Sequence, residues 1–228
     1  MSLSIIIPTL NEAACLRQAL LALQTWRQQG IEVIVVDGGS TDKTVAATTH
    51  LVDQLLLTAP GRARQMNAGA EKARGDYLLF VHADTQLPDG LPTCPHVWMD
   101  QNVQWGFFSV QLSGKKVLLR LIEWAMNWRS RVTGIGTGDQ CLFIRRALFE
   151  AQRGFPDLPL MEDVALCKQL RRRVWPRIEP YCVITSSRRW ERDGIVSTVW
   201  LMWKLRLAYF FGVSPSKLVS IYYPTGRQ

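Results

Sequence analysis

The chain has 228 residues, of which 47% are hydrophobic and 20% are charged, so it can bury one substantial core without low-complexity linkers or repeats. A formal net charge of +8 favours acidic partners, namely phosphorylated ligands, anionic lipid or nucleic acid, and does not choose among them. The five dispersed cysteines contain no C-x-x-C pair, which argues against a zinc cluster or a redox dithiol and is typical of reduced, cytoplasmic thiols.

The first half of the chain alternates strand and helix patterns. Short apolar runs predict buried strands at Leu3–Ile7, Glu32–Val36, Asp53–Leu57 and Tyr77–Val81. Helices are predicted from the N-cap Asn11 to Gly30, from the loop 37–42 to about His50, and over 62–74. We expect the first strand to stop at Pro8 and Thr9. Strands that alternate with helices imply right-handed crossovers and a parallel sheet.

Polar clusters follow the strands of this predicted sheet. They are Pro8–Glu12, Asp37–Asp42, Gly61–Asn67 and His82–Asp84. Because the carboxyl ends of parallel strands meet at one edge, all four should share one cleft. There Asp37 would accept hydrogen bonds from a base or ribose, while Arg62 or Arg64 would reach a base carbonyl or a phosphate.

The same cleft would suit a divalent cation. Asp84, with His82 two residues before it, could hold a hard cation that bridges two phosphates. Ordinary capping and turn residues are the alternative interpretation, but caps alone would not put arginines beside acids at one edge. Neither G-x-G-x-x-G nor G-x-x-x-x-G-K-[ST] follows any strand, which counts against dinucleotide and P-loop sites.

Three segments together resemble glycosyltransferase family 2, inverting enzymes of the GT-A fold. They are Ser4-Ile-Ile-Ile-Pro-Thr-Leu-Asn-Glu12, Val35-Val-Asp-Gly-Gly-Ser-Thr-Asp42 and Val81-His-Ala-Asp84. The segment Gly61-Arg-Ala-Arg-Gln-Met-Asn67 resembles a bacterial branch often labelled arsenosugar-biosynthesis-type glycosyltransferases, a label that does not establish the substrate. The resemblance implies a single α/β domain with a mainly parallel, Rossmann-like sheet flanked by helices, a mixed acceptor-side half and C-terminal helices.

The resemblance also implies roles for individual residues. In that family the first loop and the Asp after the second strand hold the nucleotide, usually uridine diphosphate (UDP), of a sugar donor. The residues that would bind the nucleotide here are Pro8, Thr9, Glu12, Asp37, Arg62, Arg64, Asn67, His82 and Asp84. Asp84 matches the second acid of the family's Asp-x-Asp metal motif, and His82 replaces the first. Ligation of Mn²⁺ or Mg²⁺ therefore depends mainly on Asp84, with His82 as a further ligand or phosphate contact.

The second half should build the acceptor side. It contains a strand-like run at Trp105–Leu112, an amphipathic basic helix at Lys116–Arg131 and a short strand at Cys141–Ile144. The glycine-rich loop before that last strand includes Gly138, Asp139 and Gln140, which would contact acceptor or donor. A flexible hinge with a solvated Asp139 is the alternative interpretation.

Glu162 and Asp163 open a helix with apolar positions from Val164 to Leu170. Acids in a first turn suit the helix macrodipole, which by itself explains their presence. Inverting transfer, however, needs a carboxylate that takes the proton of the acceptor hydroxyl, and the family places this base in a Glu-Asp pair. We assign the general base to Asp163, with Glu162 as its neighbour.

Two features follow a predicted strand at Arg177–Thr185. Ser186-Ser-Arg-Arg-Trp190 resembles the family's Gln-x-x-Arg-Trp element with Ser186 in place of Gln, which favours a single transfer over polymerisation. Arg189 would face the diphosphate and Trp190 an acceptor ring, unless the two simply stack at the surface. The apolar segment Ile195–Val213 is interrupted by Lys204 and Arg206, and so falls short of a membrane span.

Three interpretations of Ile195–Val213 stay open: a buried helix or homodimer face, a helix on an anionic membrane surface, and a true span. We divide the chain into a GT-A domain at 1–190, with a nucleotide-sugar half at 1–100 and an acceptor half at 101–190, and a helical extension at 191–228. Only four residues, Ser4 to Ile7, precede Pro8 as an apolar run, so no signal peptide is expected. The protein should be cytoplasmic, or lie at the inner face of the membrane.

The sequence thus predicts a metal-assisted, inverting glycosyltransferase that uses a UDP-sugar and a hydroxyl acceptor. Nucleotidyl transfer to a sugar phosphate is an alternative, although Pro8–Glu12 lacks the glycine-rich loop that this chemistry usually shows. A basic nucleic-acid-binding domain is a third hypothesis, favoured by charge alone, and we expect no nucleic-acid partner.

Overall fold

The structure is a computed structural model that describes residues 2–222, apart from the side chains of Pro92 and Arg189. The strands are β1 (Leu3–Thr9), β2 (Glu32–Asp37), β3 (Gln54–Leu57), β4 (Tyr77–Phe80), β5 (Trp105–Leu112), β6 (Leu142–Arg145) and β7 (Arg177–Thr185). The helices are α1 (Ala13–Ala22), α2 (Gln24–Gln28), α3 (Thr44–Ala47), α4 (Arg62–Lys72), α5 (Cys94–Asp100), α6 (Val117–Thr133), α7 (Arg146–Ala151), α8 (Glu162–Leu170), α9 (Arg188–Arg192), α10 (Ile195–Phe210) and α11 (Pro215–Tyr222). Two short 3-10 turns, η1 (Leu91–Thr93) and η2 (Gly138–Gln140), complete the described elements.

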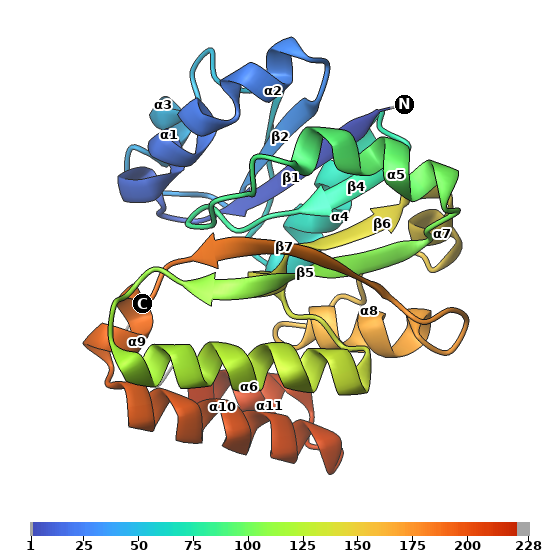
Figure 1. Ribbon diagram of the computed structural model, residues 1–228. Coiled ribbons are helices and arrows are strands. Elements are labelled where there is room, and N and C mark those ends of the chain that lie inside the picture. The colour runs from blue at the N-terminus through green and yellow to red at the C-terminus, as the bar shows by residue number, and fades with distance from the viewer. Residues whose placement is uncertain (1, 223–228) are drawn as a thin grey trace.

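One sheet of seven strands organises the molecule, in the order β3-β2-β1-β4-β6-β5-β7 (Figure 1). The first four strands of this order are parallel, β6 is antiparallel to both of its neighbours, and β5 is parallel to β7. The predicted α/β class, its parallel first half and its mixed second half are therefore confirmed. Because β1, β2 and β4 are parallel neighbours, the loops that follow them leave the same edge of the sheet.

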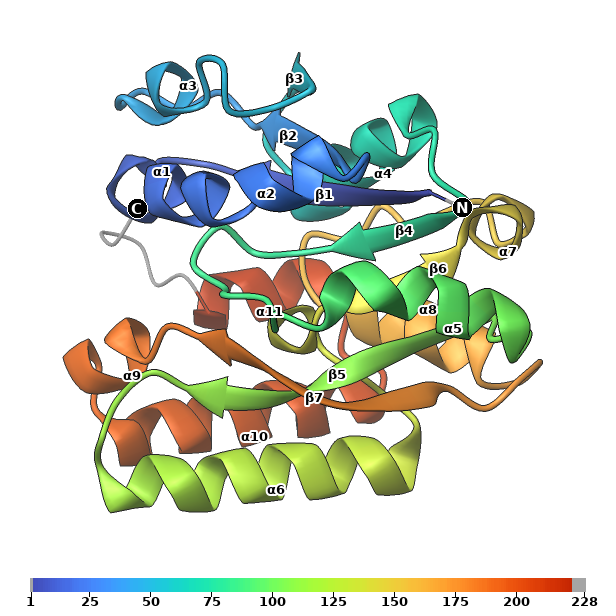
Figure 2. The ribbon, with the colours of Figure 1, turned by 45° about the horizontal axis from the view of Figure 1, so that its top comes forward.

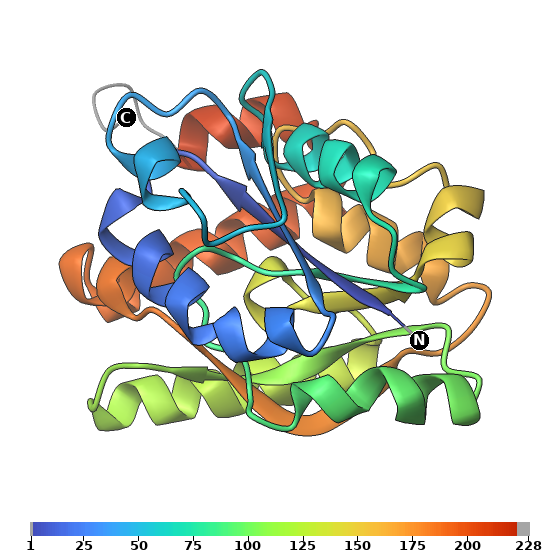
Figure 3. The same ribbon diagram turned by 90° about the horizontal axis from the view of Figure 1, so that it is seen from above.

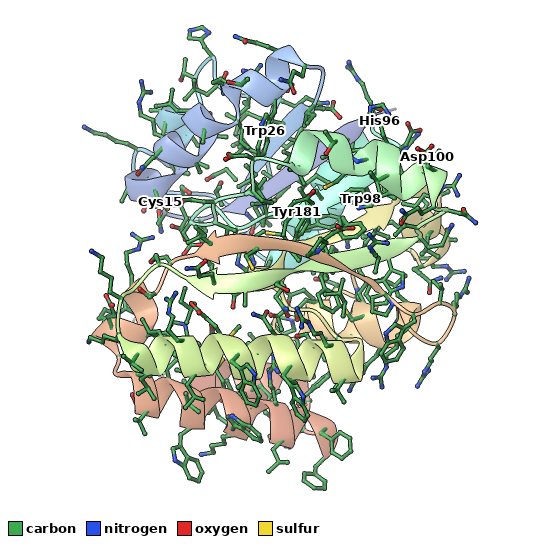
Figure 4. The ribbon with its side chains drawn as sticks, in the orientation of Figure 1. Cys15, Trp26, His96, Trp98, Asp100 and Tyr181 are labelled. Carbon is green, nitrogen blue, oxygen red and sulfur yellow. The ribbon has the colours of Figure 1, made fainter. Side chains whose placement is uncertain are left out.

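Helices cover both faces of the sheet (Figure 3). On one face α1 and α5 pack against alternate residues of β1 and β2, and on the other α4, α7 and α8 pack against the intervening residues. Trp98 of α5 points toward the sheet, where its ring stacks 3.9 Å from that of Phe143, whereas His96 and Asp100 lie on the exposed side of the helix (Figure 4). The two apolar layers fix the strand register and hence which side chains reach the edge.

Several predicted element boundaries were wrong. The first strand continues through Pro8 to Thr9, since β4 ends opposite Ile6 and the N–H that proline lacks does not interrupt the β1–β4 ladder. Asn11 is not an N-cap: its φ is 55°, and its side-chain oxygen accepts the N–H of Thr41 at 2.9 Å. The helix instead begins at Ala13 and gives way to a second helix after Leu23.

The sequence also predicted one helix that is longer than the helix in the structure. The helix predicted to run to His50 is limited to α3, because His50 has a φ of 63° and the chain must turn there into β3. Residues 223–228 of the predicted extension 191–228 lie outside the described residues. Within residues 2–222, no helix combines the length and the apolar character that crossing a bilayer requires.

Candidate active site

Asp37 lies at the carboxyl end of β2 and is 1% exposed. Its Oδ2 accepts the backbone N–H groups of Gly39 and Ser40 at 2.9 and 2.8 Å, so the loop after β2 curls around the carboxylate. The hydroxyl of Thr9, at the end of β1, lies 3.4 Å from Asp37 Oδ1. The structure therefore brings two predicted nucleotide-binding residues together, on neighbouring strands 28 residues apart in the chain.

Gln65 of α4 joins the ends of these two strands, and sequence reasoning missed it. Its Nε2 donates to the carbonyl oxygens of Thr9 and Val36, both at 2.8 Å, and the side chain is 4% exposed. A signal for it existed, because Gln65 shares the buried face of α4 with Ala63, Met66 and Gly69. A polar residue on an otherwise apolar helix face must find buried partners.

Other predicted nucleotide-binding residues have protein partners. The Asn67 amide forms a paired contact with the backbone of Phe155, donating to its carbonyl at 2.8 Å and accepting its N–H at 2.9 Å. Arg64 Nη2 lies 3.4 Å from Asp157 Oδ2, with both side chains largely exposed. Glu12 accepts a hydrogen bond from Cys15 Sγ at 3.1 Å. Their assignment to the nucleotide stays a prediction.

A second group of residues meets around the turn η2. The ring of His82, at the end of β4, lies with Nδ1 3.3 Å from Asp139 Oδ1. A Cβ atom on Gly138 would collide with the imidazole ring of His82, so a larger residue there would require the ring or the turn to shift. The Gly138 N–H donates to Asp163 Oδ2 at 2.8 Å, which places the amino terminus of α8 against the same turn.

Glu162 and Asp163 behave differently, although they are adjacent. Asp163 is half-buried and its Oδ1 accepts its neighbour's N–H, that of Val164, at 2.7 Å. Glu162 is 3% exposed, and burial together with the Asp163 charge raises the pKa of its carboxyl, an effect that Arg62 opposes from 3.8 Å. A small pocket forms here, lined by Arg62, Met66, Phe80, His82, Gly138, Leu142, Phe155, Glu162 and Asp163.

Arg129 of α6 is a half-buried cation that interacts with acids near this pocket, and sequence reasoning also missed it. Burial lowers the pKa of its guanidinium, while the charges of Asp163 and Asp139 act in the opposite direction. The pattern of α6 offered only the general signal of a basic amphipathic helix. Only the tertiary structure brings this particular arginine close enough to the two acids for their charges to affect its pKa.

The remaining described residues predicted to contact donor or acceptor do not line this pocket. Gln140 is 1% exposed, and its side-chain oxygen accepts the hydroxyl of Ser130 at 2.7 Å, so it holds η2 from within. Trp190 packs against the small apolar cluster of Leu112, Leu119 and Ile122. The predicted role of Arg189 falls on a side chain outside the described part of the structure. These assignments stay predictions.

Of the two predicted metal ligands, Asp84 is the better placed to bind a metal ion. It is half-buried two residues beyond His82, and no hydrogen bond or ion pair to it occurs among the described residues. His82 is less suitable, because Nδ1 faces Asp139 and Nε2 is buried against Gly138 without a hydrogen-bond partner. Residues 2–222 contain no cluster of three acidic, histidine or cysteine side chains that could hold a metal ion alone.

Residues 4–94 match the family model described as Glycosyl transferase family 2. An uncharacterized glycosyltransferase of Haemophilus influenzae is 36% identical over 89 residues, which cover 36% of each chain. A PGL/p-HBAD biosynthesis glycosyltransferase of Mycobacterium bovis is 40% identical over 91 residues, which cover 37% of this chain and 36% of the relative. The matched segment thus spans about a third of the length of these curated relatives.

Solved structures share the fold over a larger part of the chain. The structure of Staphylococcus aureus TarS 1–349 in complex with UDP has a TM-score of 0.65 at 20% identity, covering 82% of this chain and 60% of the other. A mannosyltransferase from Pyrobaculum calidifontis, in complex with GDP-Man and Mn²⁺, has a TM-score of 0.63 at 23% identity, covering 90% and 60%. These likenesses show the GT-A fold.

Proposed function

We propose that the chain, whose residues 4–94 match the family model of glycosyltransferase family 2, is an inverting enzyme that moves a sugar from a UDP donor to a hydroxyl acceptor. One observation carries this proposal: the hydrogen bond from Gly138 to Asp163 places a carboxylate at the end of β4, beside His82. The ends of β1 and β2, with Thr9 and Asp37, leave the same edge of the sheet.

The nucleotide would bind at Asp37 and Thr9. The Asp37 carboxylate is already held by two backbone N–H groups, so its orientation is set before a ligand arrives. An ionised carboxylate at the end of a strand can accept hydrogen bonds from a ribose or a base. Support for UDP as the nucleotide comes from TarS and from glucosyl-3-phosphoglycerate synthase of Mycobacterium tuberculosis, both of which were crystallised with UDP.

Asp163 would act as the general base. Its two oxygens accept N–H groups of Gly138 and Val164, which hold the carboxylate in one orientation in the lining of the pocket. It would accept the proton of the acceptor hydroxyl as the oxygen attacks the anomeric carbon and the bond to the diphosphate breaks. Glu162 is more deeply buried than Asp163, and the raised pKa of its carboxyl makes it the weaker candidate for an ionised base.

The residues present fit a divalent cation whose remaining ligands come from the phosphates of the donor. Mg²⁺ and similar hard cations are commonly held by one or two carboxylates together with substrate phosphates, and Asp84 supplies one such carboxylate. When bound, the cation would stabilise the negative charge of the departing diphosphate. His82 would instead position the turn η2 through its contacts with Asp139 and Gly138.

We also propose a cytoplasmic location. All five cysteines are free, and three of them, Cys94, Cys141 and Cys167, are buried. Burial raises the pKa of the Cys94 thiol to about 12 and that of Cys15 to about 11, so both stay protonated and unreactive at neutral pH.

Titration calorimetry with UDP, with and without Mn²⁺, tests the proposed donor site. We expect UDP to bind more tightly with Mn²⁺, and Asp84→Ala to remove only this metal-dependent increase. Asp100→Ala is the matched control, because Asp100 lies on the exposed side of α5. Salt-dependent binding to DNA, with no response to UDP and Mn²⁺, would instead support the nucleic-acid hypothesis.

A further inference from the structure

Three polar side chains of helix α6 point toward strand β5. Asn127 donates to the carbonyl of Val110 and accepts its N–H, both at 2.9 Å, and Arg120 Nη2 donates to the carbonyl of Leu112 at 2.6 Å. Glu123 accepts the N–H of Leu112. These groups are needed because β6 pairs only with residues 105–107 of β5, which leaves the later part of that strand edge without a neighbouring strand.

The opposite face of α6 is apolar and exposed. Its residues are spaced three or four positions apart, and their exposed fractions are Val117 84%, Leu121 58%, Trp124 63%, Trp128 57% and Val132 58%. The two indole rings stack, with centroids 6.3 Å apart. A surface helix that faces water carries its polar residues outward, so this inverted pattern indicates a nonaqueous partner.

Helix α10 lies alongside α6 and continues the same kind of surface. Ile195 and Val199 of α10 share an apolar cluster with Leu119 and Ile122 of α6, and both helices lie on the same side of the molecule (Figures 1 and 2). The exposed residues of α10 are Val196, Trp200, Trp203, Leu207 and Phe210, and both tryptophans are more than 70% exposed. We call the exposed residues of the two helices the α6–α10 face.

The charge of the α6–α10 face indicates which kind of partner it binds. Across residues 115–133 and 195–210 the only acidic residue is Glu123, which is buried and paired with Arg120 at 2.9 Å. The exposed charges are all positive: Lys115, Lys116, Arg131 and Lys204. A second copy of the chain would bring like charges together, whereas an anionic surface would complement them.

We propose that the α6–α10 face docks on the surface of an anionic lipid bilayer, with both helices lying in the plane of the interface. Tryptophan is enriched where a bilayer meets water, because its ring is apolar and its N–H can still find a polar partner. Lysine and arginine beside such rings add attraction to anionic headgroups. Neither α6 nor α10 meets the requirements for a span, so the contact is peripheral.

Docking would also orient the candidate active site. Lys168 of α8 places its Nζ 4.6 Å from the centre of the Tyr209 ring, so the far end of α10 contacts the helix that begins with Glu162 and Asp163. The docked face is therefore connected through α8 to the carboxylate that we propose as the general base. This consequence rests on the proposed function, but the docking itself does not.

Vesicle sedimentation of the full chain, without donor or acceptor, tests the proposal. We expect binding to vesicles of phosphatidylcholine with about one-third phosphatidylglycerol, and at least about tenfold weaker binding to phosphatidylcholine alone. Trp200→Ser with Trp203→Ser should abolish binding and the blue shift of tryptophan emission that accompanies it. Arg131→Glu with Lys204→Glu should weaken binding to the anionic vesicles by about tenfold or more.

Two matched variants serve as controls. Arg17→Glu with Lys72→Glu changes the net charge by the same amount on exposed residues of other helices, and Leu57→Ser removes an exposed apolar side chain on β3. Both should bind vesicles like the parent chain. Equal binding to neutral and anionic vesicles, or no binding to either, would overturn the proposal. So would a dimer in sedimentation velocity that the tryptophan variant converts to a monomer, since a second copy would then cover the face.

Discussion

The backbone N–H of Gly138 donates a 2.8 Å hydrogen bond to Asp163 Oδ2, across 25 residues of sequence. The bond joins the turn η2, which lies against His82, to the first turn of α8. Because the second carboxylate oxygen of Asp163 accepts the N–H of Val164, the side chain is held from two sides. The position of the candidate base therefore depends on a loop glycine as much as on its own helix.

Gly138→Ala should disturb this arrangement. The new Cβ would collide with the His82 ring, and we expect this clash to displace the turn and lengthen the hydrogen bond from Gly138 to Asp163. Misplacement of a catalytic group by about 1 Å can cost roughly 100-fold in rate, so we expect kcat to fall at least about tenfold. Steady-state kinetics measure this. Gly90→Ala is the control, since its Cβ meets only the Tyr181 ring at 3.2 Å, and an unchanged kcat for Gly138→Ala would contradict the expectation.

Asp163→Asn should separate binding from turnover. The amide keeps the size of the side chain but cannot take the acceptor proton, and it can accept only one of the two N–H groups that hold the carboxylate, so we expect kcat to fall by about 10²–10⁴-fold. UDP affinity, measured by calorimetry, should stay within about twofold of the parent, which is a change of less than about 0.5 kcal/mol. Asp100→Asn, on the exposed side of α5, is the control. Normal turnover by Asp163→Asn would show that another group is the base.

Gln65→Met should loosen the ends of β1 and β2. The substitution keeps the length of the side chain but leaves the carbonyl oxygens of Thr9 and Val36 without the amide that they share. A buried polar group that loses its partner costs about 1–3 kcal/mol, which should appear in the free energy of unfolding by urea. UDP affinity should also fall, because Thr9 and Asp37 lie on those ends. Gln18→Met, on the exposed side of α1, should change neither quantity.

Glu162→Gln should raise stability at neutral pH. Burial and the Asp163 charge raise the pKa of the Glu162 carboxyl, so the folded chain holds this proton more tightly than the unfolded chain does. The stabilisation from the protonated form is complete below the unfolded pKa of about 4.3 and is lost as pH rises through the higher folded pKa. The neutral amide avoids that loss.

Thermal unfolding between pH 4 and pH 8 checks this expectation. The Tm of Glu162→Gln should exceed that of the parent at pH 7, with roughly 2–4 °C for each kcal/mol gained, and the two should converge near pH 4. Glu150→Gln, whose side chain is 65% exposed, should follow the parent at every pH. A gap between Glu162→Gln and the parent that stays constant from pH 4 to pH 8 would exclude titration of Glu162 as its cause.

Much of the fold could be predicted because its signals are local. The apolar run Tyr77–Val81 is too short for a helix and sufficiently apolar to be covered on both faces, and β4 occupies nearly the same residues. The alternation of such runs with helical patterns then implied the parallel order. The wrong predictions also came from local signals. Asn11 has the residue type of an N-cap, but its side-chain oxygen accepts the N–H of Thr41, 30 residues away in the chain.

The sequence by itself determined the class of fold, the edge at which polar side chains gather and the resemblance of residues 4–94 to glycosyltransferase family 2. These follow from residue periodicity and from short motifs, which depend on neighbours in the chain. Only the tertiary structure decided that Gln65 joins β1 to β2, that the charges of Asp139 and Asp163 act on Arg129 and that α6 turns its tryptophans outward. The first and the last depend on which backbone groups remain unpaired after the sheet has formed, and all three are set by contacts between segments far apart in the chain.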